Sequence, residues 1–142
     1  MKFWDSSALA PCFLEESATP RIQLLLQDDP EVVVWCLTRV EIISAIGRRS
    51  RENPLQAPQL LKLRDEVLSK FSRWAAVSEI NLVREHAERL LLAHPLRAAD
   101  ALQLGAAIVA AENQPATLEF VTLDRRLGAA AAREGFPVLG VI

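Results

Sequence analysis

The chain has 142 residues, of which 51% are hydrophobic and 24% are charged, the usual mix for one globular domain spanning residues 1–142. Sixteen Lys and Arg residues against eighteen Asp and Glu residues give a formal net charge of −2, which excludes a general polyanion binder. The apolar runs are too short to cross a bilayer, and Lys2 is not followed by a signal-peptide core. We therefore expect a cytoplasmic protein with no membrane-spanning segment, and any contact with nucleic acid should be local.

Strand-like and helix-like segments alternate along the chain. Runs of β-branched and aromatic residues, bounded by turn residues, predict strands at 1–5, 31–36, 77–80, 117–123 and 138–142. Helical spacing and helix-forming composition predict helices at 19–27, 38–46, 59–76, 81–94, 98–111 and 124–134. Asn81 is the expected cap of the helix at 81–94. This alternation favours an α/β fold with three layers, α/β/α, on a parallel central sheet, with a helical elaboration at about 56–95.

Four carboxylates stand out, but three of them have ordinary structural explanations. Asp5 ends the first strand and can cap the helix that follows it. Thr38 and Glu41 have the spacing of a capping box, in which each side chain bonds a backbone N–H at a helix start. Asp124 directly follows the strand at 117–123 and can cap the next helix. Taken singly, none of these three acids indicates a functional site.

Asp100 is different because it lies in a helix in which most other residues up to Ala111 are apolar. An ionised carboxylate removed from water without a partner is very costly, so Asp100 requires a cation or a network of donors. Pairing with an arginine such as Arg97 is one way to satisfy it. A functional role for Asp100 is the stronger interpretation.

The four acids are more informative together than singly. Asp5, Glu41 and Asp124 each fall where a strand gives way to a helix, and in a parallel sheet these positions share one edge. Two carboxylates about 4 Å apart repel by roughly 4 kcal/mol at an effective dielectric of about 20, so such a cluster requires a cation. Oxygen ligands without nearby His or Cys favour Mg²⁺ or Mn²⁺. Such an ion lowers the pKa of bound water and neutralises the charge on a phosphodiester during hydrolysis.

Several polar residues have supporting roles in this hypothesis. Hydrogen bonds that hold the carboxylates in place are expected from Ser6, Ser7 and Thr122. Candidate contacts to substrate phosphates are Arg39, Arg48 and Arg125.

The remaining residues with chemical potential offer no rival site. Cys12 and Cys36 lie in apolar surroundings without the spacing of a metal motif, so we expect reduced core thiols. His86 falls on a mostly polar helix face, and His94 is placed to interact with the carbonyl end of its helix. Trp4 is either core beneath the site or a surface for stacking a base, and the core is the better-supported interpretation.

Four motifs, in this order and spacing, resemble the PIN-domain family, and within it the VapC-type ribonuclease toxins of bacterial toxin–antitoxin pairs. They are Phe3-Trp-Asp-Ser-Ser-Ala-Leu9, Thr38-x-x-Glu41, Leu96-Arg-Ala-Ala-Asp-Ala-Leu-Gln-Leu104 and Val121-Thr-Leu-Asp-Arg-Arg-Leu127. The resemblance covers nearly the whole chain. It implies a parallel sheet of five strands flanked by helices.

The resemblance also implies a metal-dependent ribonuclease site with one or two Mg²⁺ or Mn²⁺ ions. The implied catalytic acids are Asp5, Glu41, Asp100 and Asp124. We expect Asp5 and Asp100 to be the main metal ligands and Asp124 to be a direct or water-mediated ligand. Glu41 is expected to be a ligand or the base that orients the attacking water. The implied partners are an RNA substrate, a cognate antitoxin protein in the groove beside the site, and a second copy of the chain in a homodimer.

The chain departs from the family pattern in two places. Pro11-Cys12 stands where family members often carry a basic residue, which bears on substrate contacts. Arg125-Arg126 follows Asp124, where a further acid often stands.

Two other functions are compatible with some of these features. A phosphohydrolase with Asp5 as nucleophile would need an acid in place of Ser7 and a lysine near the sheet edge. The lysines available are Lys2, Lys62 and Lys70. A non-catalytic module of the same fold could instead bind a partner through the hydrophobic stripe at Leu60–Trp74.

Overall fold

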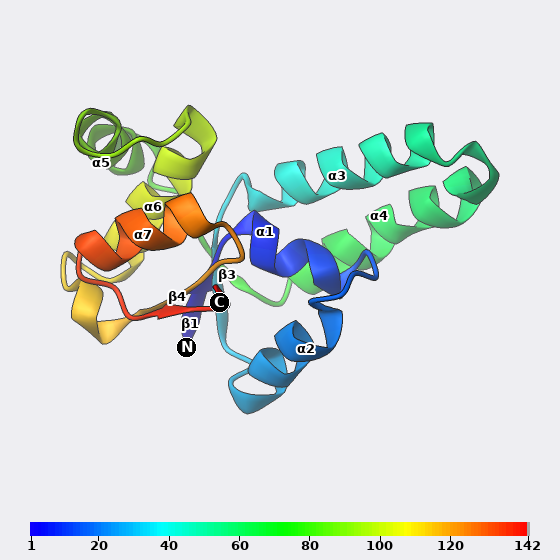
Figure 1. The fold of residues 1–142 in the computed structure, drawn as a ribbon, viewed down its shortest axis with the longest axis horizontal. Helices are drawn as coiled ribbons and strands as arrows, with labels where there is room; N and C mark the ends of the chain where they lie inside the picture. Colours follow the sequence, from blue (N-terminus) through cyan, green and yellow to red (C-terminus); the bar gives the residue numbers. More distant parts are fainter. Residues whose placement is uncertain (142) are drawn as a thin grey trace.

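The computed structural model describes residues 1–141, which form a parallel five-stranded sheet with helices on both faces (Figure 1). The strands are β1 (Lys2–Trp4), β2 (Val32–Trp35), β3 (Ala75–Val77), β4 (Glu119–Val121) and β5 (Val138–Leu139). Their order in the sheet is β3-β2-β1-β4-β5, so the first strand of the chain is the central one. The predicted α/β fold and five-strand parallel sheet are confirmed.

The helices complete two outer layers. They are α1 (Ser6–Leu9), α2 (Thr19–Asp28), α3 (Thr38–Glu52), α4 (Ala57–Phe71), α5 (Ile80–Ala93), α6 (Ala98–Ala110) and α7 (Arg125–Arg133). Short 3₁₀ turns lie at Ala10–Cys12, Pro54–Gln56 and Pro115–Thr117. Figure 1 shows α3 and α4 as a helical hairpin that extends away from the sheet. The helical elaboration expected at about 56–95 consists of α4 and α5, separated by β3.

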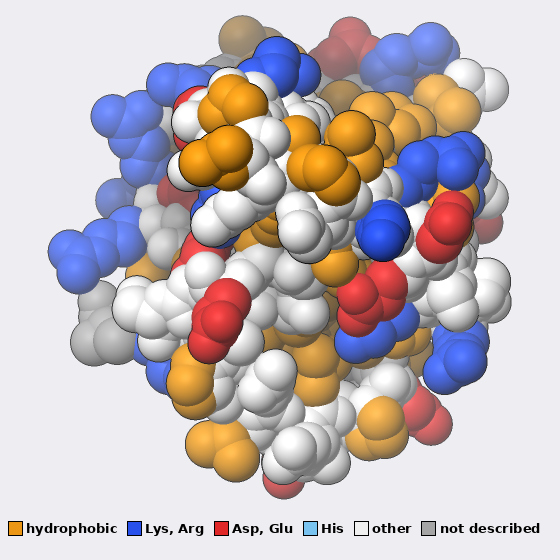
Figure 2. Space-filling model, turned by 90° about the vertical axis from the view of Figure 1, so that its right-hand side faces the viewer, with side chains coloured by type: hydrophobic (Ala, Val, Ile, Leu, Met, Phe, Trp, Pro, Cys, Tyr) orange, Lys and Arg blue, Asp and Glu red, His pale blue; other side chains and the backbone are white. Residues whose placement is uncertain are grey.

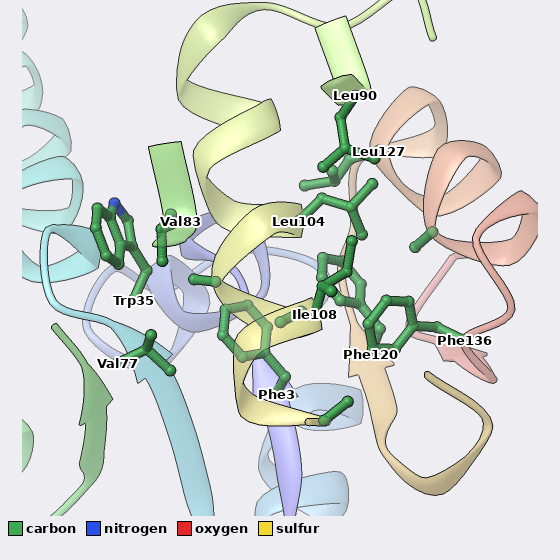
Figure 3. Close-up of a cluster of buried hydrophobic side chains, with 14 of the residues drawn as sticks. Phe3, Trp35, Val77, Val83, Leu90, Leu104, Ile108, Phe120, Leu127 and Phe136 are labelled. Atoms are coloured by element: carbon green, nitrogen blue, oxygen red, sulfur yellow. The ribbon is translucent and has the colours of Figure 1, made fainter. Parts of the chain in front are cut away.

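Successive strand residues point to opposite faces of the sheet, and helices cover both faces, so strand side chains are buried on both sides. Phe3 packs with α5, α6 and α7 in one hydrophobic cluster, part of which is shown in Figure 3. Trp4 is fully buried in the second cluster, with residues of α1, α2, α3 and α4. The interpretation of Trp4 as a core residue is therefore confirmed, and the base-stacking alternative is wrong.

Helix α6 lies unusually close to α5, and this fixes the position of the residues it carries toward the site. A Cβ atom at Gly105 would lie 2.9 Å from the carbonyl oxygen of Val83, so a larger residue would push the two helices apart. Most of α6 is buried, including Leu104 and Gln103. The prediction of a central buried helix at 98–111 is confirmed.

Several local predictions differ from the structure. The strand expected at 77–80 lies instead at Ala75–Val77, and Ile80 begins α5. The helix predicted at 59–76 ends at Phe71, because Ala75 and Ala76 pair with Val33 and Val34 as the start of β3. Asn81 lies inside α5, and Glu79 occupies the cap position. The final strand ends at Leu139, and residue 142 of the predicted strand lies outside the described residues.

None of the helices in residues 1–141 is both long enough and apolar enough to span a membrane.

Candidate active site

Asp5 lies directly after β1, at the carboxyl edge of the central strand. Its side chain is almost fully buried, with 3% exposure, and accepts hydrogen bonds from the Ser7 hydroxyl at 2.8 Å and the Ser7 backbone N–H at 3.3 Å. Asp5 therefore caps α1, as its sequence position predicts. The same geometry keeps the carboxylate at the sheet edge where parallel α/β folds bind ligands.

Ser7 connects the end of β1 to the end of β4. Its hydroxyl gives its one proton to Asp5, accepts from the Leu123 N–H at 3.0 Å, and lies 3.2 Å from the Thr122 hydroxyl. Thr122 in turn accepts from the Asp124 N–H at 3.0 Å. A continuous chain of hydrogen bonds thus fixes Asp5 relative to the segment that carries Asp124.

Glu41 is held from two other elements. Its Oε2 atom accepts from the Ser6 hydroxyl and its Oε1 atom accepts from the Gln103 side-chain amide, each at 2.8 Å. Thr38 is buried and exchanges hydrogen bonds with Gln103, while Leu37 occupies the cap position of α3. The capping-box interpretation of Thr38 and Glu41 is therefore wrong, because both side chains point to tertiary partners.

Gln103 was not among the predicted site residues, yet it joins α6 to Glu41. It is 1% exposed and lies three residues after Asp100, on the same side of α6. Its amide would be costly to bury without partners, and Glu41 and Thr38 supply them. Apart from Asp100, Gln103 is the only polar side chain between Ala98 and Ala110, and this isolated amide is the signal in the sequence.

Asp124 and Asp100 complete the set of acids. Asp124 caps α7 by accepting hydrogen bonds from the backbone N–H groups of Arg126 at 2.9 Å and Leu127 at 3.1 Å. Asp100 is half-buried in the first turn of α6. None of the four acids forms an ion pair within 4.0 Å with a Lys, Arg or His side chain of the described chain, so the Asp100–Arg97 pairing considered above does not form in residues 1–141.

Burial raises the pKa values of two of the four acids, Asp5 and Asp100. Burial raises the pKa of Asp5 to about 7, even though hydrogen bonds from Ser7 and Thr122 act in the opposite direction. Burial, and then the negative charge of Asp124, raise the pKa of Asp100 above its usual range. The backbone and guanidinium of Arg97 and the charge of Arg126 partly offset that rise. Both carboxylates are therefore costly to ionise in the protein alone.

The four carboxylates line a single cleft of about 640 Å³ at the carboxyl edge of the sheet. Ser6, Ser7, Arg48 and Arg97 also line it. Within residues 1–141, no three His, Cys, Asp or Glu side chains are already placed closely enough to hold an ion together. The donor chemistry nevertheless fits a hard divalent cation, because every candidate ligand in the cleft is a carboxylate or hydroxyl oxygen.

Two of the three arginines predicted to contact phosphate lie at or beside the cleft, and the third does not. Arg48 lines the cleft, and Arg125 lines an adjoining hollow that shares Asp100 and Asp124 with it. Arg39 is exposed in the first turn of α3 and lines neither space.

The cysteines and histidines lie outside this cleft. Burial raises the pKa of the Cys12 thiol to about 11, which leaves it unreactive at neutral pH, and Cys36 is also a free thiol. The imidazole of His94 lies 2.8 Å from the Glu134 carboxylate, which also accepts a hydrogen bond from Arg89 at 2.7 Å. Glu134 thereby connects the end of α7 to α5.

The fold and the cleft define a parallel α/β domain with an acidic, all-oxygen site at the end of its central strand. The model of the PIN domain family matches residues 2–133, so the chain belongs to the PIN domain family. Members of this family are generally nucleases and generally use divalent metal ions.

One solved structure supports the same fold. The chain is similar to the crystal structure of PAE2754 from Pyrobaculum aerophilum, with a TM-score of 0.62 and 20% identity over 99% of this chain and 87% of that chain. At this identity the likeness concerns the fold alone. A comparison with curated protein sequences gave no match.

The buried Asp5 carboxylate predicts a pH-dependent loss of stability in the metal-free protein. Its folded pKa of about 7 lies above the ordinary value of 3.8, so the folded state binds more protons between these pH values. The free energy of unfolding should therefore fall as pH rises from about 4 to 7, by roughly 2–4 kcal/mol in total. Asp5→Asn, which retains an oxygen to cap α1, should flatten this fall and raise the Tm at pH 8.

Urea unfolding in chelator across this pH range measures the effect. Asp65→Asn is the matched control. The substitution removes the same charge, but from a side chain that is 87% exposed. A lower Tm for Asp5→Asn at pH 8 would mean that capping outweighs the cost of the buried charge.

Proposed function

We propose that this chain is a metal-dependent endoribonuclease that hydrolyses RNA phosphodiester bonds in the cytoplasm as a single PIN domain over residues 1–142. The observation that supports this proposal is the convergence of Asp5, Glu41, Asp100 and Asp124 on one cleft, where none of them forms an ion pair with a Lys, Arg or His of residues 1–141. The charge of Asp124 already disfavours ionisation of Asp100, and a cation in the cleft would relieve this repulsion and attract a phosphate.

In this proposal Asp5, Asp100 and Asp124 hold one or two Mg²⁺ or Mn²⁺ ions. The bound metal would supply Lewis acidity, which favours deprotonation of water and offsets the charge that develops on the phosphate. Ser7 and Thr122 keep Asp5 and Asp124 in register through their shared hydrogen bonds.

Glu41 has a different environment from the other three acids. Ser6 donates to one carboxylate oxygen of Glu41 and Gln103 donates to the other, which fixes the plane of the carboxylate. Each oxygen can still accept a further hydrogen bond. Glu41 is thereby suited to accept a proton from the attacking water and to orient that water, or to serve as a further ligand.

We further propose that the enzyme is the toxin of a type II toxin–antitoxin pair and that it forms a homodimer. An apolar groove of about 370 Å³ on the α3–α4 hairpin supports a protein partner. Leu55 at its edge is 96% exposed, and Figure 2, which faces this end of the molecule, shows hydrophobic side chains gathered beside Lys and Arg. The apolar face of an antitoxin helix suits such a groove.

The hydrophobic stripe at Leu60–Trp74 contributes only its first part to this groove. Leu60 and Leu63 line it, whereas Val67 and Phe71 are buried in the core.

The phosphohydrolase alternative has no supporting contact. Lys2 lies at the opposite edge of the sheet, 3.3 Å from Asp29 and 3.6 Å from Glu119, and none of the lysines lines the acidic cleft. Ser7 uses its hydroxyl to hold Asp5 rather than to protonate a leaving group.

The nuclease proposal predicts cleavage of structured RNA by the purified chain in Mg²⁺ or Mn²⁺, followed on denaturing gels. Chelator should abolish cleavage, because the carboxylates alone cannot neutralise a phosphate. Asp100→Asn should lower the rate by more than about 100-fold, the upper end for losing a residue that merely supports a ligand. Asp65→Asn should cleave like the unmodified chain. Cleavage that continues in the presence of chelator, or that persists in folded Asp100→Asn protein, would contradict the proposal.

The contact between Gln103 and Glu41 predicts a positioning role that can be separated from packing. Gln103→Leu frees Glu41 and should lower kcat by about tenfold or more with little change in KM, because general base catalysis contributes about 100-fold or more. Thr38→Val leaves the Gln103–Glu41 hydrogen bond in place and is the matched control. Both changes should cost roughly 1–3 kcal/mol of stability through a lost buried hydrogen bond. Equal kcat for the two variants would assign Gln103 a purely structural role.

The toxin proposal predicts that the unmodified chain, expressed alone in bacterial cells, arrests growth by cleaving RNA. Asp100→Asn, produced at the same level by immunoblot, should permit growth. Normal growth with the catalytically active chain would separate the nuclease from a toxin role.

A further inference from the structure

The acidic cleft continues into a hollow on each side. A hollow of about 480 Å³ shares Arg97, Asp100 and Asp124 with the cleft. On the other side, a hollow of about 430 Å³ shares Ser7, Arg48 and Asp124 with it. Because the three spaces share lining residues, they adjoin one another and form a trough, with the four acids lining its middle part.

The two ends of this trough differ in charge. The first hollow is lined by Arg97, Arg125 and Arg126, and its only acids are Asp100 and Asp124, which belong to the central cleft. We call it the Arg97 flank. It therefore carries an excess of positive charge beside the site.

The opposite end is electrically balanced. Arg48 and Arg49 line it together with Glu16 and Glu52. Arg49 lies 3.4 Å from Glu16, so part of its charge is already paired within the protein. We call this end the Arg48 flank.

The positions of these arginines in their helices support the same asymmetry. Arg97 is the cap residue of α6, and Arg125 and Arg126 form the first turn of α7, so the N-terminal ends of two helices face the Arg97 flank. Cations are normally favoured at helix C-termini, and N-terminal N–H groups favour anions. Three arginines at this position do not stabilise these helices. The first N–H groups of α7 already donate to Asp124, so the arginine side chains, and not the helix ends, are the groups that suit a phosphate.

We propose that the chain binds an RNA strand chiefly on one side of the phosphate to be cleaved, through backbone phosphates held by Arg97, Arg125 and Arg126. This inference rests on the proposed nuclease function. The Arg48 flank contributes little phosphate binding, because Arg49 is paired with Glu16 and Glu52 adds a further negative charge to the same hollow. Single-stranded RNA is the class of substrate that fits an open trough with charge along one end.

The dependence of binding on salt tests this asymmetry without requiring cleavage. The probe is a fluorescently labelled single-stranded RNA of mixed sequence, bound in Ca²⁺, with anisotropy measured from about 50 to about 200 mM salt. Each phosphate contact that is lost should reduce the slope of log K against log salt by about 0.7 for a single strand. Arg97→Gln/Arg126→Gln should therefore reduce the slope by about 1.4. Arg48→Gln/Arg49→Gln removes the same charge and should reduce it by less than half as much.

The matched control is Arg64→Gln/Arg73→Gln, two exposed arginines that line none of the three spaces. It should leave the slope unchanged, and thermal unfolding should show all three variants folded. If the Arg97 flank variant behaves like this control, its arginines serve only to offset Asp100 and Asp124. That result, or an equal loss from both flanks, overturns the proposal.

The two levels of the hypothesis fail separately. RNA that is cleaved by a chain with equal flanks would overturn one-sided binding and leave the nuclease intact. A one-sided loss of salt dependence in a chain that never cleaves RNA would support the binding asymmetry and overturn the nuclease.

Discussion

The carboxylate of Asp5, buried at the end of the central strand, is the constraint on which the rest of the site depends. A strand with neighbours on both sides leaves this side chain almost no solvent, and its pKa rises to about 7. Ser7 stabilises it from the first turn of α1, and Ser7 in turn bonds the end of β4. The position of Asp124 therefore follows from the requirement to satisfy Asp5.

The convergence of acids was predictable from the sequence because it follows from topology. Carboxyl ends of parallel strands share one edge, so residues that follow β1, β2 and β4 must approach each other whatever their side chains. Asp5 and Asp124 also act as the caps that local rules predict. For these two residues, a structural role and a place in the cleft are compatible, because a capping carboxylate can keep a free oxygen lone pair.

Local rules failed where tertiary contacts took over. Thr38 and Glu41 match a capping box, yet Gln103, more than sixty residues away in sequence, binds both side chains. The spacing of residues along the sequence does not reveal such a contact. The one indication of it is an isolated amide, Gln103, in a mostly apolar helix. Ala75 and Ala76 favour helix by composition, but pairing with β2 places them in a strand. Intrinsic helix propensity determined the secondary structure only where pairing in the sheet did not favour a strand.

The distribution of charge explains how a chain with a net charge of −2 would attract a polyanion, as the proposed function requires. The acids around Lys2 lie at the opposite edge of the sheet, and charges beyond about 8 Å are largely screened at physiological salt. A phosphate in the trough therefore responds to the residues beside it rather than to the total charge. The cleft alone would repel it, because four carboxylates line that space. Under the proposed function, Arg97 in the cleft and Arg125 and Arg126 beside it would offset part of this repulsion and allow a phosphate to approach the acidic site.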